Sequence, residues 1–301
     1  MQTNLHLQEA SEAGQRFNMK KLFLILSSLV LISSAYSYDR DYTKIQKKHI
    51  AAEGEHFDFR DVFGNPFTTV LNPDVERNDF KKENFVHDGH FVTYKNDRRY
   101  ISKQGIDISR HDGEVDWQKL KDDGIEFVIL RIGYRGYQSG KLKTDENFHK
   151  NIQGALKAGL EVGVYVFSQA KNDAEAIEEA DLVINELKNY QITLPVFYDP
   201  EIIRDDKARS DHITGERFTK NAVLFCEKIK KAGYEPGVYS NMLWEAYEFD
   251  LTKFKEYWIW YADYEEIPQT PYHFSFWQYA EKDGETKAPY DMDIMLVPVK
   301  Y

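Results

Sequence analysis

Two carboxylates one residue apart end the apolar stretch Leu194-Pro-Val-Phe-Tyr-Asp-Pro-Glu201. Side chains of an extended strand alternate between its faces, so Asp199 and Glu201 point the same way, with Cα atoms roughly 6.5–7 Å apart. Repulsion between two acids in a poorly solvated site makes one of them hold its proton more tightly. A protonated acid beside a carboxylate is the pair that hydrolysis of a glycosidic bond requires. We therefore expect both residues to be catalytic, provided that the remaining chain forms a cleft around them.

After Tyr100 the chain alternates between strand-like apolar runs and amphipathic stretches, which is typical of parallel βα units. The expected strands span residues 105–109, 127–132, 161–168, 194–201, 236–240, 258–264, 274–279 and 292–297. The expected helices span residues 117–123, 146–158, 173–189 and 215–232, with a shorter helix after Asn241. This order, with the helices missing between the last three strands, predicts an α/β fold: an irregular (β/α) barrel of TIM type with eight strands and about five helices.

Chemistry in such barrels gathers at the carboxyl ends of the strands, and other expected strands also bring acids there. Asp107 lies on the opposite face of its strand from Ile106 and Ile108, so it faces the barrel axis if the isoleucines face the helices. Asp293 lies in the last strand, with apolar neighbours on the other face. The aromatic residues that we expect to bind substrate around these acids are Tyr165, Tyr198, Tyr239, Trp260, Tyr264 and Trp277. The sequence therefore predicts an acidic centre with an aromatic rim.

The composition argues against several other functions. A formal net charge of −11 disfavours nucleic acid or an anionic membrane as the main partner, because both need basic patches. The single cysteine, Cys226, lies in a helical pattern and is expected to be a buried structural thiol. A phosphate-binding glycine loop, a Gly-x-Ser-x-Gly elbow and a cluster of metal ligands are all missing, so we expect no cofactor and no metal. Asp263 and Glu265 form a second acid pair, which we interpret as surface residues.

The N-terminal region carries a candidate targeting signal. Met19-Lys20-Lys21 precedes an apolar run, residues 22–32, and small residues end the segment at Ser37. This pattern predicts a signal peptide from about Met19 to Ser37, with an uncleaved anchor as the alternative to cleavage and Met19 as an alternative start. We therefore expect a secreted or cell-envelope protein.

Three regions follow from these patterns. Residues 1–37 form an upstream segment and signal peptide, residues 38–100 an N-terminal extension, and residues 101–301 the catalytic barrel domain. The extension is charged and irregular, with a turn signal at Gly64-Asn65-Pro66. We interpret it either as a small appendage packed on the barrel or as a spacer from the cell surface.

Short sequence motifs along the barrel region have the order and spacing of a known enzyme family. They are Gly105-Ile-Asp-Ile-Ser109, His111-Asp-Gly113, Asp116-Trp117, Phe127-Val-Ile-Leu-Arg131, Gly163-Val-Tyr-Val-Phe167, Pro195-Val-Phe-Tyr-Asp-Pro-Glu201, Gly237-Val-Tyr-Ser-Asn241, Trp260-Tyr-Ala-Asp-Tyr264, Trp277-Gln278-Tyr279 and Asp293. With them, the stretch from about Gln104 to Tyr301 resembles glycoside hydrolase family 25, the Chalaropsis-type lysozymes. The resemblance implies an N-acetylmuramidase that cuts the β-1,4 bond between N-acetylmuramic acid and N-acetylglucosamine in peptidoglycan. Its partner would be the glycan strand, with no metal, nucleic acid or stable protein partner implied.

The resemblance also implies roles for individual residues. Glu201 would be the general acid that protonates the leaving oxygen. Asp199 would either stabilise the oxocarbenium-like centre or orient the substrate's acetamido group for neighbouring attack. Asp107 and Asp293 match the family's two remaining cleft aspartates. The side chains that would line the sugar groove are Tyr165, Tyr239 and Trp260.

The sequence departs from the family's pattern at two positions. Pro200 stands between the two acids, where it removes a backbone donor and could re-aim Glu201. Met295 stands where the family often has Asn, near Asp293. Two other functions stay open. A chitinase-like glycosidase would also use an acid pair on a barrel, although such enzymes carry a further Asp where this chain has Phe197. A catalytically silent cell-wall glycan-binding protein is the other, although all four acids are retained.

Overall fold

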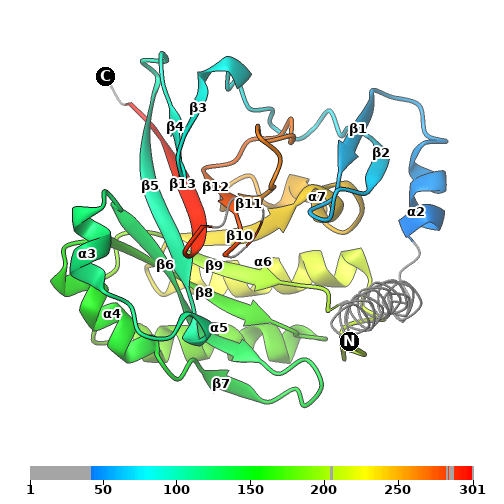
Figure 1. The fold of residues 1–301 in the computed structure, drawn as a ribbon. Helices are drawn as coiled ribbons and strands as arrows, with labels where there is room; N and C mark the ends of the chain where they lie inside the picture. Colours follow the sequence, from blue (N-terminus) through cyan, green and yellow to red (C-terminus); the bar gives the residue numbers. More distant parts are fainter. Residues whose placement is uncertain (1–41, 204–205, 283, 285–287, 300–301) are drawn as a thin grey trace, which may run out of the picture.

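The computed structural model describes residues 42–203, 206–282, 284 and 288–299, so the predicted signal segment lies outside the described residues. These residues fold into a barrel of strands with an N-terminal extension beside it (Figure 1). Within this part of the chain, no helix is both long enough and apolar enough to cross a membrane.

Within the described residues, eight strands close into a ring, which confirms the predicted irregular barrel. In chain order they are β5 (Tyr100–Ile108), β6 (Phe127–Arg135), β8 (Glu161–Ser168), β9 (Val196–Pro200), β10 (Pro236–Asn241), β11 (Trp258–Ala262), β12 (Phe276–Ala280) and β13 (Asp291–Pro298). Around the ring the order is β5, β13, β12, β11, β10, β9, β8 and β6, and β6 pairs with β5 to close it. A short strand, β7 (Leu142–Thr144), pairs with β6 beyond the closed ring.

Helices connect the strands and pack around them (Figure 1). They are α3 (Trp117–Asp122), α4 (Phe148–Lys157), α5 (Asp173–Leu187), α6 (Gly215–Lys231) and α7 (Met242–Tyr247), with single 3-10 turns at η2 (Arg110–Asp112) and η3 (Leu251–Lys253). Side chains that accept hydrogen bonds from the first turn cap α3, α5, α6 and α7; the capping residues are Asp116, Asn172, Thr214 and Asn241. Each cap satisfies a backbone N–H that has no partner inside its helix, which explains where these helices begin.

The last strand, β13, runs antiparallel to both of its neighbours, β12 and β5, which departs from the expected parallel units. The connection between β12 and β13, residues 281–290, is shorter than the dozen or more residues that a parallel crossover needs. As a result, the amino end of β13 lies where the parallel strands have their carboxyl ends. In this register Asp291 stands opposite Asp107, and Asp293 stands opposite Gly105.

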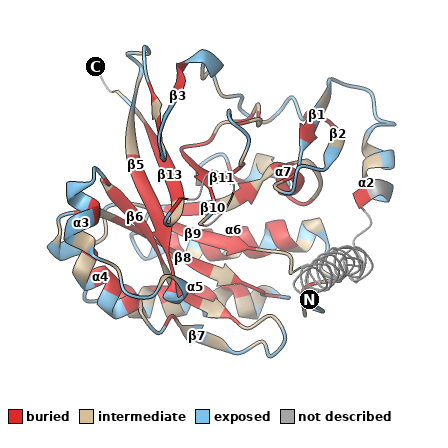
Figure 2. Cartoon of the chain, in the orientation of Figure 1, coloured by how far each residue is buried: buried red, intermediate tan, exposed pale blue. Residues whose placement is uncertain are grey.

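The barrel core has two apolar layers, and the buried positions follow the strands (Figure 2). The inner layer consists of Phe127, Ile129, Tyr165, Phe197, Trp260, Phe276 and Met295. Gly105 and Gly237 make room for the inner rings of Phe127 and Phe197, because a Cβ at either glycine would overlap the ring. The outer layer, between strands and helices, contains Cys226, which is buried as predicted. Since side chains fill the barrel, a substrate site must lie at one of its ends.

The described part of the extension consists of one helix and two hairpins. Its elements are α2 (Tyr42–His49), the hairpin of β1 (His56–Arg60) and β2 (Pro66–Val70), the turn η1 (Lys82–Asn84), and the hairpin of β3 (Phe85–Asp88) and β4 (Phe91–Tyr94). In Figure 1, α2, β1 and β2 lie beside α7. Tyr247 of α7 accordingly contacts the rings of Tyr42 and Phe67, and its hydroxyl donates to the Thr68 carbonyl at 2.7 Å.

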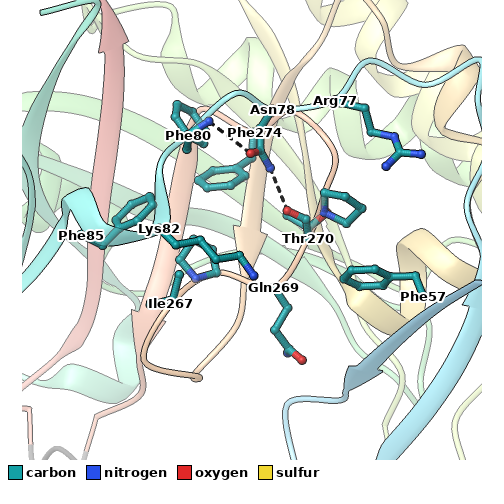
Figure 3. A pocket seen from close by; sticks show the side chains of 12 residues that line it. Phe57, Arg77, Asn78, Phe80, Lys82, Phe85, Ile267, Gln269, Thr270 and Phe274 are labelled. Atoms are coloured by element: carbon teal, nitrogen blue, oxygen red, sulfur yellow. Dashed lines mark hydrogen bonds between the residues drawn. The ribbon is translucent and has the colours of Figure 1, made fainter. Parts of the chain in front are cut away.

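The extension also bonds directly to the barrel's strands and loops. The Asn78 amide donates to the carbonyl oxygens of Thr270 and Tyr272 at 2.8 and 2.9 Å, and the Tyr94 N–H donates to Ser102 Oγ at 3.0 Å. A cavity of about 250 Å³ lies between the extension and the loop before β12 (Figure 3). Its lining includes Asn78 but none of the four predicted acids. In the structure, residues 42–100 are therefore a packed appendage of the barrel.

Candidate active site

Glu201 follows the last residue of β9, and its side chain lines a cavity of about 130 Å³ together with Tyr239, Tyr264 and Glu281. Pro200 is the final residue of the strand, in register with Ser168 of β8. Glu201 therefore still lines the cavity although Pro200 precedes it.

Burial and nearby carboxylates make Glu201 a weak acid. The pKa of Glu201 is raised to about 7, mainly by burial and also by the charges of Asp291 and Glu281, while Arg131 opposes the rise. A carboxyl group with this pKa still carries a proton in a large share of molecules at neutral pH. General acid catalysis is most effective when the pKa of the donor lies near the working pH.

Asp199 lies on the same face of β9 and is buried. Its Oδ1 atom has no hydrogen-bond partner among the described residues. Burial raises the pKa of Asp199 well above its usual value, the charge of Glu201 adds to the rise, and Arg131 opposes it. Two acids that influence each other in this way titrate as a pair rather than independently.

Asp107 and Asp293 form a second pair, deeper in the barrel. Gln278 donates to Asp107 Oδ2 at 2.7 Å, and the indole of Trp260 donates to Asp293 Oδ1 at 2.8 Å. Burial raises the pKa of Asp293 well above its usual value, and the hydrogen bond from Trp260 opposes that shift. Burial also raises the pKa of Asp107, and the charge of Asp293 adds to the rise, so the two carboxyl groups do not titrate independently.

Asp293, which we expected to be catalytic, is fully buried and does not line the cavity that contains Glu201. Its Oδ1 accepts the hydrogen bond from the Trp260 indole, and it stands opposite Gly105, two residues before Asp107 on β5.

Asp291 is an acid near Glu201 that sequence reasoning missed, and its charge raises the pKa of Glu201. It stands two residues before Asp293 on the same face of β13, opposite Asp107, and it is only partly buried. The pKa of Asp291 is raised to about 6, mainly by burial and also by the charges of nearby acids, while a hydrogen bond from the Lys282 N–H opposes the rise. Strand alternation could have identified Asp291, but the expected strand began one residue too late, at Met292.

The predicted aromatic residues divide between the cleft and its floor. Tyr239 and Tyr264 line the cavity, and both hydroxyls donate to Gln278 Oε1 at 3.0 Å. Trp260 is 1% exposed and packs edge-on against Tyr165 and Tyr239, with ring centroids 5.6 and 4.8 Å away. Tyr165 and Trp260 are therefore the floor that holds the acids and the tyrosines in place.

Two of the predicted aromatics lie outside the cleft. Tyr198 points toward α6, where its ring packs 5.0 Å from Phe225 and its hydroxyl hydrogen-bonds Ser168 Oγ at 2.7 Å. Trp277 points toward the extension and packs 5.4 Å from Phe85. Each alternates with an inward-facing neighbour along its strand, which places it in the outer layer.

Asp263 is a buried structural residue, which corrects its interpretation as a surface acid. Its carboxylate accepts hydrogen bonds from the Tyr261 hydroxyl at 2.7 Å and from the backbone N–H groups of Glu265 and Gln269. These bonds shape the loop after β11. Glu265 itself is exposed, as expected.

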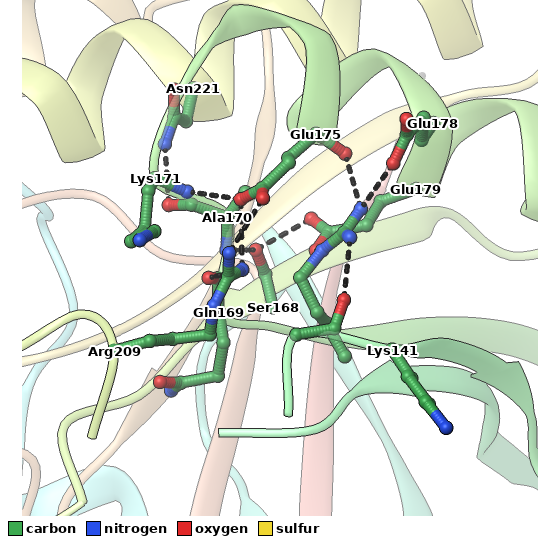
Figure 4. Close-up of polar contacts among 12 residues, drawn as sticks. Lys141, Ser168, Gln169, Ala170, Lys171, Glu175, Glu178, Glu179, Arg209 and Asn221 are labelled. Atoms are coloured by element: carbon green, nitrogen blue, oxygen red, sulfur yellow. Dashed lines mark hydrogen bonds and ion pairs between the residues drawn. The ribbon is translucent and has the colours of Figure 1, made fainter. Parts of the chain in front are cut away.

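A polar network holds the segment after β9, and Figure 4 shows the part of it in which Arg209 contacts Glu175 and the Gln169 backbone. Gln169 donates to the Glu201 carbonyl oxygen at 2.6 Å, and Ser210 Oγ donates to Gln169 Oε1 at 2.6 Å. Arg209 donates to the Gln169 carbonyl at 2.9 Å and pairs with both oxygens of Glu175. The network thus fixes the backbone of the candidate acid. Its members come from distant segments, so local patterning gave no signal for it.

Comparison with known proteins agrees with this geometry. A family model described as Glycosyl hydrolases family 25 matches residues 106–286, which is more than half of the chain. The autolytic lysozyme of Clostridium acetobutylicum is 24% identical over 161 residues. The match covers 54% of this chain and 45% of that relative, so the chain spans less than half the relative's length.

Solved structures show the same fold. The modular autolysin LytC of Streptococcus pneumoniae, in complex with a synthetic peptidoglycan ligand, has a TM-score of 0.54 at 24% identity, over 79% of this chain and 56% of that one. A family 25 glycosyl hydrolase from Bacillus anthracis has a TM-score of 0.53 at 21% identity, over 71% of this chain and 96% of that one. Fold, acid cluster and family match together assign the chain: it belongs to glycosyl hydrolase family 25.

Proposed function

We propose that the protein is a lysozyme that hydrolyses the β-1,4 bond between N-acetylmuramic acid and N-acetylglucosamine in peptidoglycan. The observation that carries the proposal is Glu201, an acid with a pKa raised to about 7 that lines a cavity within a group of further carboxylates. The names of similar proteins support it, since one is an autolytic lysozyme and another was solved with a peptidoglycan ligand.

In this proposal Glu201 donates its proton to the leaving oxygen of the glycosidic bond. The bond between the anomeric carbon and that oxygen breaks, and positive charge develops at the carbon. Asp199, buried on the same face, either stabilises that charge directly or orients the substrate's acetamido group for attack. Arg131 lowers the pKa of both acids and so favours one negative charge in the pair.

Asp291 takes the place that the resemblance gave to Asp293. It is partly exposed and acts electrostatically on Glu201, whereas Asp293 is fully buried. If Asp291 is the terminal acid of the family pattern, the position two residues later, where the family often has Asn, is Asp293. The departure from the family pattern then lies at Asp293, an acid in place of the amide, and no longer at Met295. Asp107 stands opposite Asp291 in the register, and the charges of both Asp291 and Asp293 raise its pKa.

Peptidoglycan lies outside the cytoplasm, so the proposed substrate fits the signal peptide predicted from about Met19 to Ser37. The localisation we propose is secreted or cell-envelope. Expression of the full chain, followed by N-terminal sequencing of the extracellular and envelope fractions, tests it. A mature terminus near Tyr38 supports export with cleavage, and an intact protein confined to the cytoplasm contradicts it.

The test of the activity is digestion of purified peptidoglycan, followed by mass analysis of the new reducing ends. A lysozyme leaves N-acetylmuramic acid at these ends. Products that end in N-acetylglucosamine would contradict the proposed bond. Binding without any product would make the protein a silent glycan-binding protein, and cleavage of chitin alone would make it chitinase-like.

A further inference from the structure

The β1–β2 hairpin of the extension forms part of the wall of the cavity that contains Glu201. Val62 and Phe63, in the turn of this hairpin, line the cavity together with Glu201 and Tyr239. This wall comes from a segment that precedes the family match at residues 106–286. The extension therefore reaches the candidate active site itself, in addition to packing on the barrel.

Hydrogen bonds within the turn of the hairpin hold its conformation. The buried Asp61 carboxylate accepts hydrogen bonds from the Phe63 N–H at 3.0 Å and the Asn65 N–H at 2.8 Å. Gly64 has φ of +79°, a conformation that glycine adopts without strain, and its carbonyl accepts from Arg60 Nη1 at 2.8 Å. The direction in which the turn presents Phe63 is therefore set before any ligand binds.

The hairpin is also fixed relative to the catalytic face of the barrel. The Gln269 side chain accepts from the Arg60 N–H at 2.8 Å and donates to the Arg60 carbonyl at 3.0 Å. The Gln269 N–H donates to Asp263 Oδ2 at 2.8 Å, and Asp263 follows β11. This chain of contacts holds the turn at the rim of the cavity, which removes much of the ordering cost that a mobile loop would add to binding.

The cavity is too small to hold a whole glycan chain, so a bound polymer must extend across this rim. Its volume of about 130 Å³ is smaller than the ~300 Å³ at which pockets for small molecules begin, so the cavity accommodates only the reacting part of a glycan chain. The remaining sugars must continue over its edge. Phe63 stands at that edge with 63% of its surface exposed, more than any other large apolar side chain in the described residues.

We propose that Phe63 on the β1–β2 hairpin is a substrate-binding residue, whose ring stacks on a sugar of the glycan strand beyond the bond that is cleaved. The axial C–H groups of a pyranose form a flat apolar face that a rigid aromatic ring can cover. An exposed aromatic that a preorganised turn presents beside a candidate catalytic acid matches that face. This inference rests on the proposed glycan substrate and assigns the extension a role in binding it.

The test compares Phe63→Ala with wild type in the full chain, using intact purified peptidoglycan. We expect KM to rise about 5- to 30-fold, the range for loss of an aromatic anchor, with a much smaller change in kcat. Phe63→Trp keeps a stacking surface and should restore KM. The control is Ile101→Ala, which removes another exposed apolar side chain, 51% exposed, at the opposite end of the barrel.

A binding measurement separates this proposal from the catalytic one. In a Glu201→Gln background, cosedimentation with insoluble peptidoglycan should show weaker binding when Phe63 is also replaced by Ala, by a similar factor. If wild type cleaves peptidoglycan while Phe63→Ala keeps the wild-type KM and affinity, the role of Phe63 is wrong and the lysozyme assignment stands. If wild type neither binds nor cleaves peptidoglycan, the lysozyme assignment is wrong and the role of Phe63 falls with it.

Discussion

Replacing Glu201 with Gln should greatly lower kcat and, at alkaline pH, stabilise the fold. The pKa of Glu201 is raised from 4.5 to about 7, so the folded protein binds this proton more tightly than the unfolded chain does. Stability that is present at acid pH is therefore lost as the pH rises from about 4.5 to 7. A shift of about 2.5 pKa units corresponds to roughly 3.4 kcal/mol at high pH. About 0.8 kcal/mol of this is already lost at pH 5, which leaves a difference of roughly 2.5 kcal/mol between pH 5 and pH 8.5.

Thermal unfolding of wild type and Glu201→Gln at pH 5 and pH 8.5 measures this difference. We expect the variant to gain roughly 5–10 °C in Tm over wild type at pH 8.5, and much less at pH 5. Its kcat on peptidoglycan should fall about 10²- to 10⁴-fold, the contribution of general acid catalysis. The control is Glu265→Gln, the same chemical change at an exposed site. An equal Tm difference at both pH values would refute the raised pKa, and full activity of Glu201→Gln would refute its role as the acid.

Three further predictions concern other buried groups. Asp291→Asn should move the alkaline limb of the kcat profile to lower pH, because Asp291 raises the pKa of Glu201; an unmoved limb would contradict the coupling. Gln169→Met should lower kcat about 10- to 100-fold with little change in KM, since the Glu201 carbonyl loses its donor; unchanged kinetics would show that this contact does not position the acid. Glu245→Gln should raise the free energy of unfolding at pH 7 by roughly 3 kcal/mol without affecting activity, because the pKa of Glu245 is raised to about 8, mainly by burial. Chemical unfolding across pH 5–9 measures this, and a pH-independent difference would argue against it.

The strand positions and the Asp199/Glu201 pair were predictable because they depend on short-range alternation. The alternation of apolar residues along a strand indicates which side chains face the barrel interior and which face the helices. Asp199 and Glu201, two residues apart at the end of β9, share one face. The same rule, applied to the aromatic positions, would have excluded Tyr198 and Trp277 from the cleft. It would also have paired Asp291 with Asp293.

The direction of β13, the Gln169 network and the position of the hairpin were beyond local patterning. Strand direction depends on how the connection after β12 crosses the barrel end, and hydrophobic periodicity is the same for parallel and antiparallel strands. Gln169 meets Ser210 and Glu201 across segments that carry no common motif. The approach of Phe63 to the cavity depends on tertiary contacts such as those of Gln269 with Arg60.

The antiparallel pairing of β13 with β5 determines when the acid cluster is completed during folding. Asp107 and Asp291 are partners in the register although more than 180 residues separate them in the chain. Pairings of such long range form slowly, because the entropy of closing a long loop must be lost before the contacts are gained. Until β13 takes its place between β12 and β5, Asp291 and Asp293 are not held beside the other acids. Completion of the site and closure of the barrel are thus one event, and a chain arrested before it has the acid pair of β9 without the rest of the centre.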